Sequence, residues 1–182
     1  TGLESNVNSY YQITNITPSS GFLADYPDAA AAYSVRQLSN NAIKCMRVRR
    51  FVPPYDEQDI GFTAAGDLDE AAIEAFGGSD VLVVSVWYDQ SGQSNHATQI
   101  TPGSQPSIYD GVAVITEKGE PAIDFSSDFL STAPFSATVS QPTTYFITVN
   151  KTNHSGYLFE RSGTNGRQAQ GDSTWIFAGG VA

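Results

Sequence analysis

The sequence is poor in the residues that build disulfide frameworks and metal centres. Its 182 residues include one cysteine, Cys45, and two histidines, His96 and His154. One cysteine excludes an intrachain disulfide and a cysteine-cluster zinc site, and two histidines exclude a histidine-rich metal site. No cofactor-binding motif occurs either, so we expect neither a metal ion nor an organic cofactor.

Positive charge and long apolar runs are also scarce. Nine Lys and Arg stand against nineteen Asp and Glu, and the formal net charge is -10. A surface of this sign repels phosphate backbones, so we expect no nucleic-acid partner. The chain has no apolar run of the roughly 18 residues that a spanning helix needs, so we expect no insertion into a membrane.

The chain does have enough apolar residues for a folded core. Hydrophobic residues make up 40% of it and aromatic residues 12%, which argues against disorder. Only 15% of the residues are charged, a composition typical of extracellular β-rich domains. We predict an N-terminal arm or linker over residues 1–20 and one folded domain over residues 21–182.

One stretch organises the rest of the chain. Residues 81–87 form a continuous apolar run rich in β-branched side chains, which predicts a strand buried on both faces. The run ends at a sharp polar turn that begins with Asp89. Such a turn either aims functional groups out of a rigid sheet or simply ends a strand. We favour the structural role, in which the Asp89 carboxylate accepts hydrogen bonds from the N–H groups of Ser91 or Gly92.

Two short helices are predicted in the first half of the chain. The first covers residues 26–38, where apolar side chains recur at helical spacing after an Asp that can act as the cap. The second covers residues 68–76. Asp67 begins a capping-box-like sequence before it, and Gly77-Gly78 supply a left-handed end.

Short alternating segments between turn residues predict a β-sandwich for the remainder. The predicted strands cover residues 43–52, 59–63, 106–110, 112–116, 122–125, 143–150, 156–160 and 174–178.

Five of the nine basic residues fall within fifteen positions: Arg36, Lys44, Arg47, Arg49 and Arg50. They could form a site for an anion or a sugar acid. They could equally pair with the acidic residues that follow at Asp56, Glu57 and Asp59, and we favour this pairing. Cys45, inside the same stretch, is expected to be a buried small apolar group rather than a nucleophile.

Several motifs occur in an order that resembles a known module. They are AAAAYSVRQLS, RVRR, QDIGF, DLDEAAIEAF, WYDQSGQSNHATQ, QPSI and GEPAIDF. The chain resembles the N-terminal part of the catalytic β-sandwich of the arabinofuranosidase B family. It resembles more closely modules of tail-fibre and other virion proteins of tailed bacteriophages. The resemblance covers about residues 23–130 and implies a concanavalin-A-like, jelly-roll sandwich.

The resemblance also implies which functions the chain lacks. In the arabinofuranosidase family the catalytic carboxylates lie beyond the matched region, and a vicinal cysteine pair lines the sugar pocket. This chain has a single cysteine. We therefore assign no catalytic residue by resemblance and favour a non-enzymatic role.

We weigh three functions. The first is a surface module of a bacteriophage virion that binds a cell-surface glycan or host receptor. Such a module would assemble with other virion chains, as a homo-oligomer, and lie at the virion surface or outside the cell. Its candidate ligand-binding residues are Asp89, Asn95, His96 and Trp175, with Trp87 and Tyr88 beside them, although Trp87 fits a buried strand end better. The second is an arabinofuranosidase-like glycoside hydrolase, whose candidate carboxylates are Asp89, Asp124, Asp128 and Glu160. The third is a purely structural module.

The last predicted strand has the character of an unprotected edge. In STWIFAGG, Trp175 and Phe177 share one face and Ile176 shares the other with an alanine. No charged residue protects this segment from pairing. We therefore expect the sandwich to be incomplete at its C-terminal end, so that a longer polypeptide or a second chain completes the sheet.

Overall fold

The computed structural model describes residues 21–135, 139, 144–150, 157–160 and 168–170. The chain divides into two compact units, of which the first reaches Ala137 and the second begins at Thr138. The arm predicted for residues 1–20 lies outside the described residues, and the predicted domain limits stay predictions. Within the described residues, no helix is long and apolar enough to cross a membrane.

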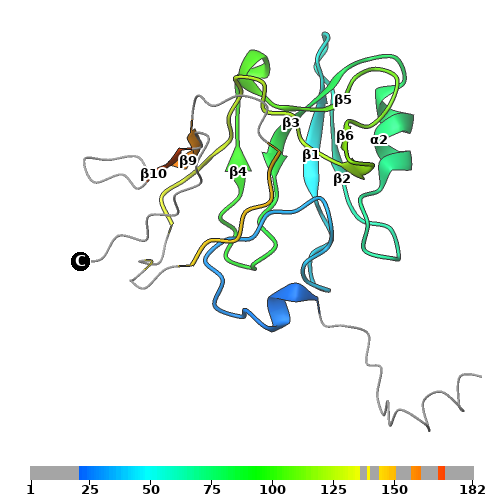
Figure 1. The fold of residues 1–182 in the computed structure, drawn as a ribbon. Helices are drawn as coiled ribbons and strands as arrows, with labels where there is room; N and C mark the ends of the chain where they lie inside the picture. The colour runs from blue at the N-terminus through cyan, green and yellow to red at the C-terminus, as the bar shows by residue number, and fades with distance from the viewer. Residues whose placement is uncertain (1–20, 136–138, 140–143, 151–156, 161–167, 171–182) are drawn as a thin grey trace, which may run out of the picture. The chain divides into compact units, whose positions relative to one another are not determined.

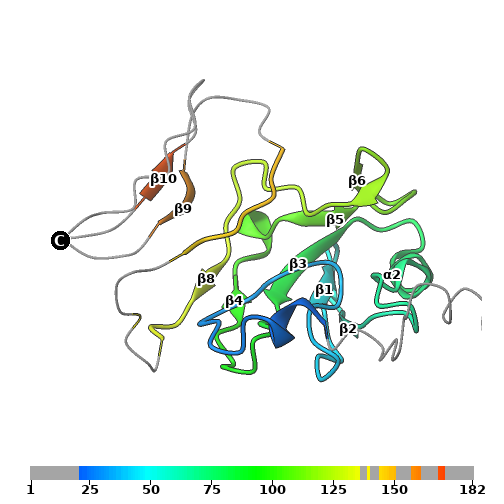
Figure 2. The ribbon, with the colours of Figure 1, turned by 60° about the horizontal axis from the view of Figure 1, so that its bottom comes forward.

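The first unit is built on one antiparallel sheet (Figure 1). Its strand order is β2-β1-β3-β4-β8. Strand β5 also pairs with β3, at the start of that strand, whereas β4 pairs with its end (Figure 2). The strands are β1 (Met46–Arg50), β2 (Glu57–Ile60), β3 (Leu82–Trp87), β4 (Ala97–Thr98), β5 (Ser107–Tyr109) and β8 (Ser131–Thr132). This arrangement confirms the prediction of a mainly β fold.

Smaller elements complete both units. In the first unit they are the 3-10 turns η1 (Phe22–Ala24) and η2 (Pro102–Ser104), helix α2 (Glu70–Gly77) and the hairpin of β6 (Thr116–Glu117) and β7 (Glu120–Pro121). In the second unit β9 (Tyr157–Glu160) pairs with β10 (Gln168–Gln170). The strand predicted at 156–160 is thus confirmed.

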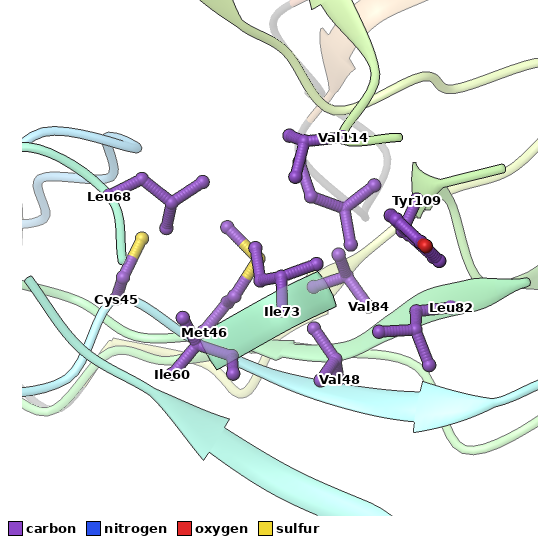
Figure 3. Close-up of a cluster of buried hydrophobic side chains, with 11 residues drawn as sticks. Cys45, Met46, Val48, Ile60, Leu68, Ile73, Leu82, Val84, Tyr109 and Val114 are labelled. Atoms are coloured by element: carbon purple, nitrogen blue, oxygen red, sulfur yellow. The ribbon is translucent and has the colours of Figure 1, made fainter. Parts of the chain in front are cut away.

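The core lies on one face of the sheet. Met46 and Val48 of β1 are fully buried there. The alternate residues Arg47 and Arg49 point to the other face, and their side chains are partly exposed. The cluster comprises Cys45, Met46, Val48, Ile60, Leu68, Ile73, Leu82, Val84, Ile108, Tyr109 and Val114. Figure 3 shows these side chains gathered against one another. The alternation and the buried strand predicted from the sequence are both confirmed.

Helix α2 contributes Ile73 to this core. Its N-cap is Asp69, whose carboxylate accepts a hydrogen bond from Ala72 N at 3.1 Å. The predicted cap, Asp67, lies two residues too early. Gly78 ends the helix with a φ of 60°, a backbone conformation that favours glycine, as predicted.

The helix predicted over residues 26–38 is wrong. Only η1 is helical in this region, and it ends at Ala24, before the predicted start. The backbone from Ala30 to Leu38 instead bonds to side chains far along the sequence. Tertiary hydrogen bonds override a local helical pattern here, because intrinsic helix propensity is only a weak preference.

The strand predicted over residues 143–150 is wrong for the part that the structure describes. Residues 144–150 belong to no helix or strand. The strand predicted at 174–178 lies outside the described residues, and so does Trp175. The jelly-roll connection and the incomplete C-terminal end therefore stay predictions.

Candidate functional site

The turn after β3 is held by the carboxylate of Asp89, a side chain that is only 8% exposed. This carboxylate accepts hydrogen bonds from Ser91 N at 2.9 Å, Ser91 Oγ at 2.7 Å and Asn95 N at 3.0 Å. A fourth comes from Ala32 N at 2.8 Å. A carboxylate has about four acceptor positions, and these bonds use them all. The predicted hydrogen bond to Ser91 is confirmed.

Gln90, which the sequence analysis overlooked, extends these bonds to residues 34–38. Its Oε1 accepts a hydrogen bond from Leu38 N at 2.7 Å, and its Nε2 donates to the carbonyls of Ser34 and Arg36, each at 3.0 Å. Its own N–H donates to the Ala32 carbonyl at 2.8 Å. Gln90 is only 4% exposed, so these bonds take the place of bonds to water.

Asn95 supplies the third contact to the same segment. Its Nδ2 donates to the Ala30 carbonyl at 2.7 Å, and its own carbonyl accepts a hydrogen bond from the hydroxyl of Tyr33. We call the side chains of Asp89, Gln90 and Asn95, together with the backbone of residues 30–38, the clamp. The clamp satisfies the backbone polar groups of a segment that has no regular structure of its own.

His96 lies beside the clamp. Its Nδ1 accepts a hydrogen bond from Asp89 N at 3.1 Å, and its ring meets that of Tyr88 edge-on, with 5.0 Å between the ring centroids. The hydrogen bonds of Asp89 and Asn95 thus stabilise the fold. A ligand-binding role for Asp89, Asn95 and His96 stays a prediction.

The opposite face of the sheet carries paired charges. Asp59 bonds Lys44 Nζ at 2.6 Å and Arg47 Nε at 2.7 Å, and Glu57 bonds Arg49 at 2.5 Å. The two remaining residues of the basic group also pair, in Arg36–Asp67 and Arg50–Asp80. The preference for pairing over an anion site is confirmed for Glu57 and Asp59.

Hydrogen bonding and partial burial shift the pKa values of Asp59 and Tyr88 on this charged face. The hydrogen bonds from Arg47 and then Lys44 hold the pKa of Asp59 well below its usual range. Tyr88 donates to Asp59 at 2.7 Å. Partial burial, and then this hydrogen bond to a carboxylate, raise the pKa of Tyr88 to about 12.

Trp87 and two neighbouring rings form a row at the end of β3. The ring of Trp87 lies 5.7 Å from that of Tyr33 and 6.5 Å from that of Phe125, measured between centroids. Trp87 also packs against the core and directs its Nε1 at the Ser34 carbonyl, 3.4 Å away. Phe125 is 42% exposed. The row therefore has a fixed inner part and an outer ring that faces solvent.

Two of the candidate carboxylates flank Phe125. Backbone bonds of 2.9 and 3.0 Å tie Asp124 to Ser107 of β5. Partial burial, and then the charge of Asp124, raise the pKa of Asp128. Asp124 and Asp128 thus lie four positions apart in one segment, while Asp89 lies in the clamp and Glu160 belongs to β9 of the second unit. Phe125 itself was not among the predicted site residues, although its position between Asp124 and Asp128 is visible in the sequence.

A shallow hollow of about 330 Å³ lies elsewhere in the first unit. Arg36, the cation on its wall, pairs with Asp67 at 3.1 Å. The side chain of Gln37 donates to the Ala42 carbonyl at 2.7 Å. In the part of the chain that the structure describes, no group of three or more His, Cys, Asp or Glu could hold a metal ion.

Comparison with known proteins gives a weak structural likeness. No family model and no curated protein matches the chain. Two solved structures that resemble it are a GH54 α-L-arabinofuranosidase soaked with a cyclic sulfate inhibitor and an arabinofuranosidase complexed with arabinofuranosyl-α-1,2-xylobiose. Each match has 24% identity and a TM-score of 0.41, and covers 47% of this chain but 21% of the enzyme. The match spans about a fifth of those enzymes and carries no argument about activity.

Proposed function

We propose that this chain is a non-catalytic surface module of a bacteriophage virion, of the tail-fibre type, that binds a cell-surface glycan. The observation that carries the proposal is the ring of Phe125, exposed to solvent and backed by Trp87 and Tyr33. Exposed aromatic rings provide apolar faces on which the C–H faces of sugar rings stack.

The surroundings of Phe125 favour such a contact. The inner rings pack against the core or bond to the clamp, so the surface is already ordered before a ligand arrives. An ordered surface loses little conformational entropy on binding, which favours affinity. Asp124 and Ser126 are the sequence neighbours of Phe125, and their side-chain oxygens, which bond each other at 2.9 Å, can also bond sugar hydroxyls.

The order of the sequence motifs, which resembles that of virion modules, supports the virion assignment. This assignment includes partners among other virion chains, a homo-oligomeric state and a place at the virion surface or outside the cell. A virion module with a glycan-binding surface at Phe125 would attach the virion to a glycan receptor on its host.

A glycan array with the purified full chain tests the binding. We expect the wild type to bind at least one class of glycan and the Phe125→Ala variant to lose most of that signal. Val112→Ala is the matched control, because Val112 is an exposed apolar residue, 83% exposed, in a turn outside the aromatic row. A folded wild type that binds nothing on the array would favour the purely structural role.

A second candidate is an arabinofuranosidase-like hydrolase, and one observation favours it. The pKa of Asp128 is raised beside a second carboxyl group, and glycosidases use a pair of carboxyl groups about 5–10 Å apart, one of them with a raised pKa. We expect no hydrolysis of an aryl arabinofuranoside by this chain. Turnover that is abolished by Asp124→Asn, Asp128→Asn or Glu160→Gln would establish the hydrolase instead.

A further inference from the structure

We infer that the surface around Phe125 binds uncharged glycans and rejects acidic ones, with Asp124 and Asp128 accepting hydrogen bonds from sugar hydroxyls. This inference rests on the proposed glycan-binding function and adds the class of glycan. It follows from how the turn at 124–129 is held and from the charge around it.

The turn at 124–129 is fixed at both ends. Asp124 exchanges two backbone hydrogen bonds with Ser107, and Phe129 N donates to the Ser104 carbonyl at 3.3 Å. Between them Ser127 has a φ of 68°, in the left-handed region that few non-glycine residues adopt. The ring and both carboxylates therefore leave one short, anchored turn.

The carboxylate of Asp124 is oriented before any ligand binds. Its Oδ1 accepts a hydrogen bond from Ser126 Oγ at 2.9 Å. Among the described residues, no hydrogen bond uses its Oδ2. Asp128 likewise accepts no hydrogen bond from a described residue. Ionised carboxylates only accept hydrogen bonds, and sugar hydroxyls are donors, so these oxygens suit an uncharged sugar that stacks on Phe125.

The same two carboxylates disfavour an acidic sugar. No described Lys or Arg forms an ion pair with either of them, so their charges are not neutralised within that part of the chain. The repulsion between them is already visible in the raised pKa of Asp128, for which partial burial is the larger cause and Asp124 the second. A carboxylate, sulfate or phosphate group on the ligand would add a third negative charge at short range. The net charge of -10 adds repulsion over longer distances, which salt screens.

The experiment compares neutral glycans with counterparts that carry the same core plus a sialic or uronic acid. Binding of the full wild-type chain is measured at low and at high salt. We expect the acidic counterpart of each bound glycan to bind at least about tenfold more weakly at low salt, a factor of the size that two nearby like charges produce. The difference should narrow at high salt.

Two variants assign this discrimination to the site. Asp124→Asn and Asp128→Asn should each weaken binding of the neutral glycan. Each should also narrow the difference in affinity between the neutral glycan and its acidic counterpart. The matched control is Asp110→Asn, which makes the same change in net charge at an exposed turn carboxylate of the same unit. This control should leave unchanged both the affinity for the neutral glycan and the difference in affinity between the two glycans.

The outcomes separate this inference from the proposed function. Equal or tighter binding of acidic glycans, or site variants that change no more than Asp110→Asn does, would overturn the inference while leaving glycan binding in place. A folded wild type that binds no glycan would overturn both. Loss of folding in a variant is checked by its melting temperature, and Phe125→Ala then replaces it as the test of location.

Discussion

Replacing Asp89 by Ala should remove the centre of the clamp. The change leaves three backbone N–H groups, those of Ala32, Ser91 and Asn95, without the acceptor that they have in the native chain. A buried donor without a partner costs about 1–3 kcal/mol, and the lower end applies here because the bonds are partly buried and water can reach some of them. The free energy of unfolding should therefore fall by about 3 kcal/mol. For a chain of this length, that corresponds to a fall of roughly 6–12 °C in melting temperature.

Chemical denaturation monitored by tryptophan fluorescence measures this loss. A Trp175→Phe background leaves Trp87 as the remaining tryptophan. Trp87 lies 5.7 Å from Tyr33 of the clamped segment, so its emission reports on the clamp. The denaturation midpoint should move to lower denaturant with little change in the slope, because the surface exposed on unfolding stays nearly the same.

Asp110→Ala is the control for this prediction. Asp110 makes the same kind of turn, accepting hydrogen bonds from Val112 N and Ala113 N, each at 2.8 Å. Its turn is exposed, so water replaces the lost bonds and the loss of stability should be smaller. Equal midpoint shifts for the two variants would refute the claim that burial makes the Asp89 bonds important.

Three further predictions follow from the pKa shifts. Because the pKa of Asp59 is held low, chiefly by Arg47, its contribution to stability is fully present above about pH 4 and lost as the pH falls further; Asp59→Asn should therefore unfold less steeply with acid than the wild type does. Burial raises the pKa of Cys45 to about 12, so a thiol reagent at mildly alkaline pH should react only after denaturation, and rapid labelling of the folded chain would contradict this. In an ultraviolet titration, Tyr88→Phe should remove a phenol that ionises at about 12, and loss of a group that ionises near pH 10 would show the assignment wrong.

The parts of the fold that were predictable are those with strong local patterns. Alternation places Met46 and Val48 in the core, and the apolar run before Trp87 gives the central strand. The end of α2 at Gly78 was also visible, because the left-handed conformation there favours glycine. The start of α2 was misplaced by two residues, since Asp67 and Asp69 are equally good caps by sequence.

The failures have a common physical cause. The segment 26–38 has a cap and an apolar spacing that predict a helix, but the side chains that bond its backbone at Ala30 and Leu38 lie more than fifty positions away. No local pattern contains those partners. For the same reason the sequence pointed to Asp89 while missing Gln90, whose role appears only when its distant carbonyls are in place. Phe125 was missed because the exposure of an aromatic ring depends on which residues pack around it in the fold.

The clamp has a consequence for the order of folding. Its hydrogen bonds join residues between 52 and 65 positions apart. Closing such a loop costs roughly 3–4 kcal/mol of chain entropy before the bonds form. Residues 30–38 leave the ribosome before β3 and its turn do, and these supply their distant partners, so we expect residues 30–38 to join the native structure late. Asn95→Ala should accordingly speed unfolding in stopped-flow experiments while leaving the refolding rate nearly unchanged, and slower refolding would place the clamp in the folding nucleus instead. A segment that is synthesised before its hydrogen-bond partners is thus one of the last to find its place.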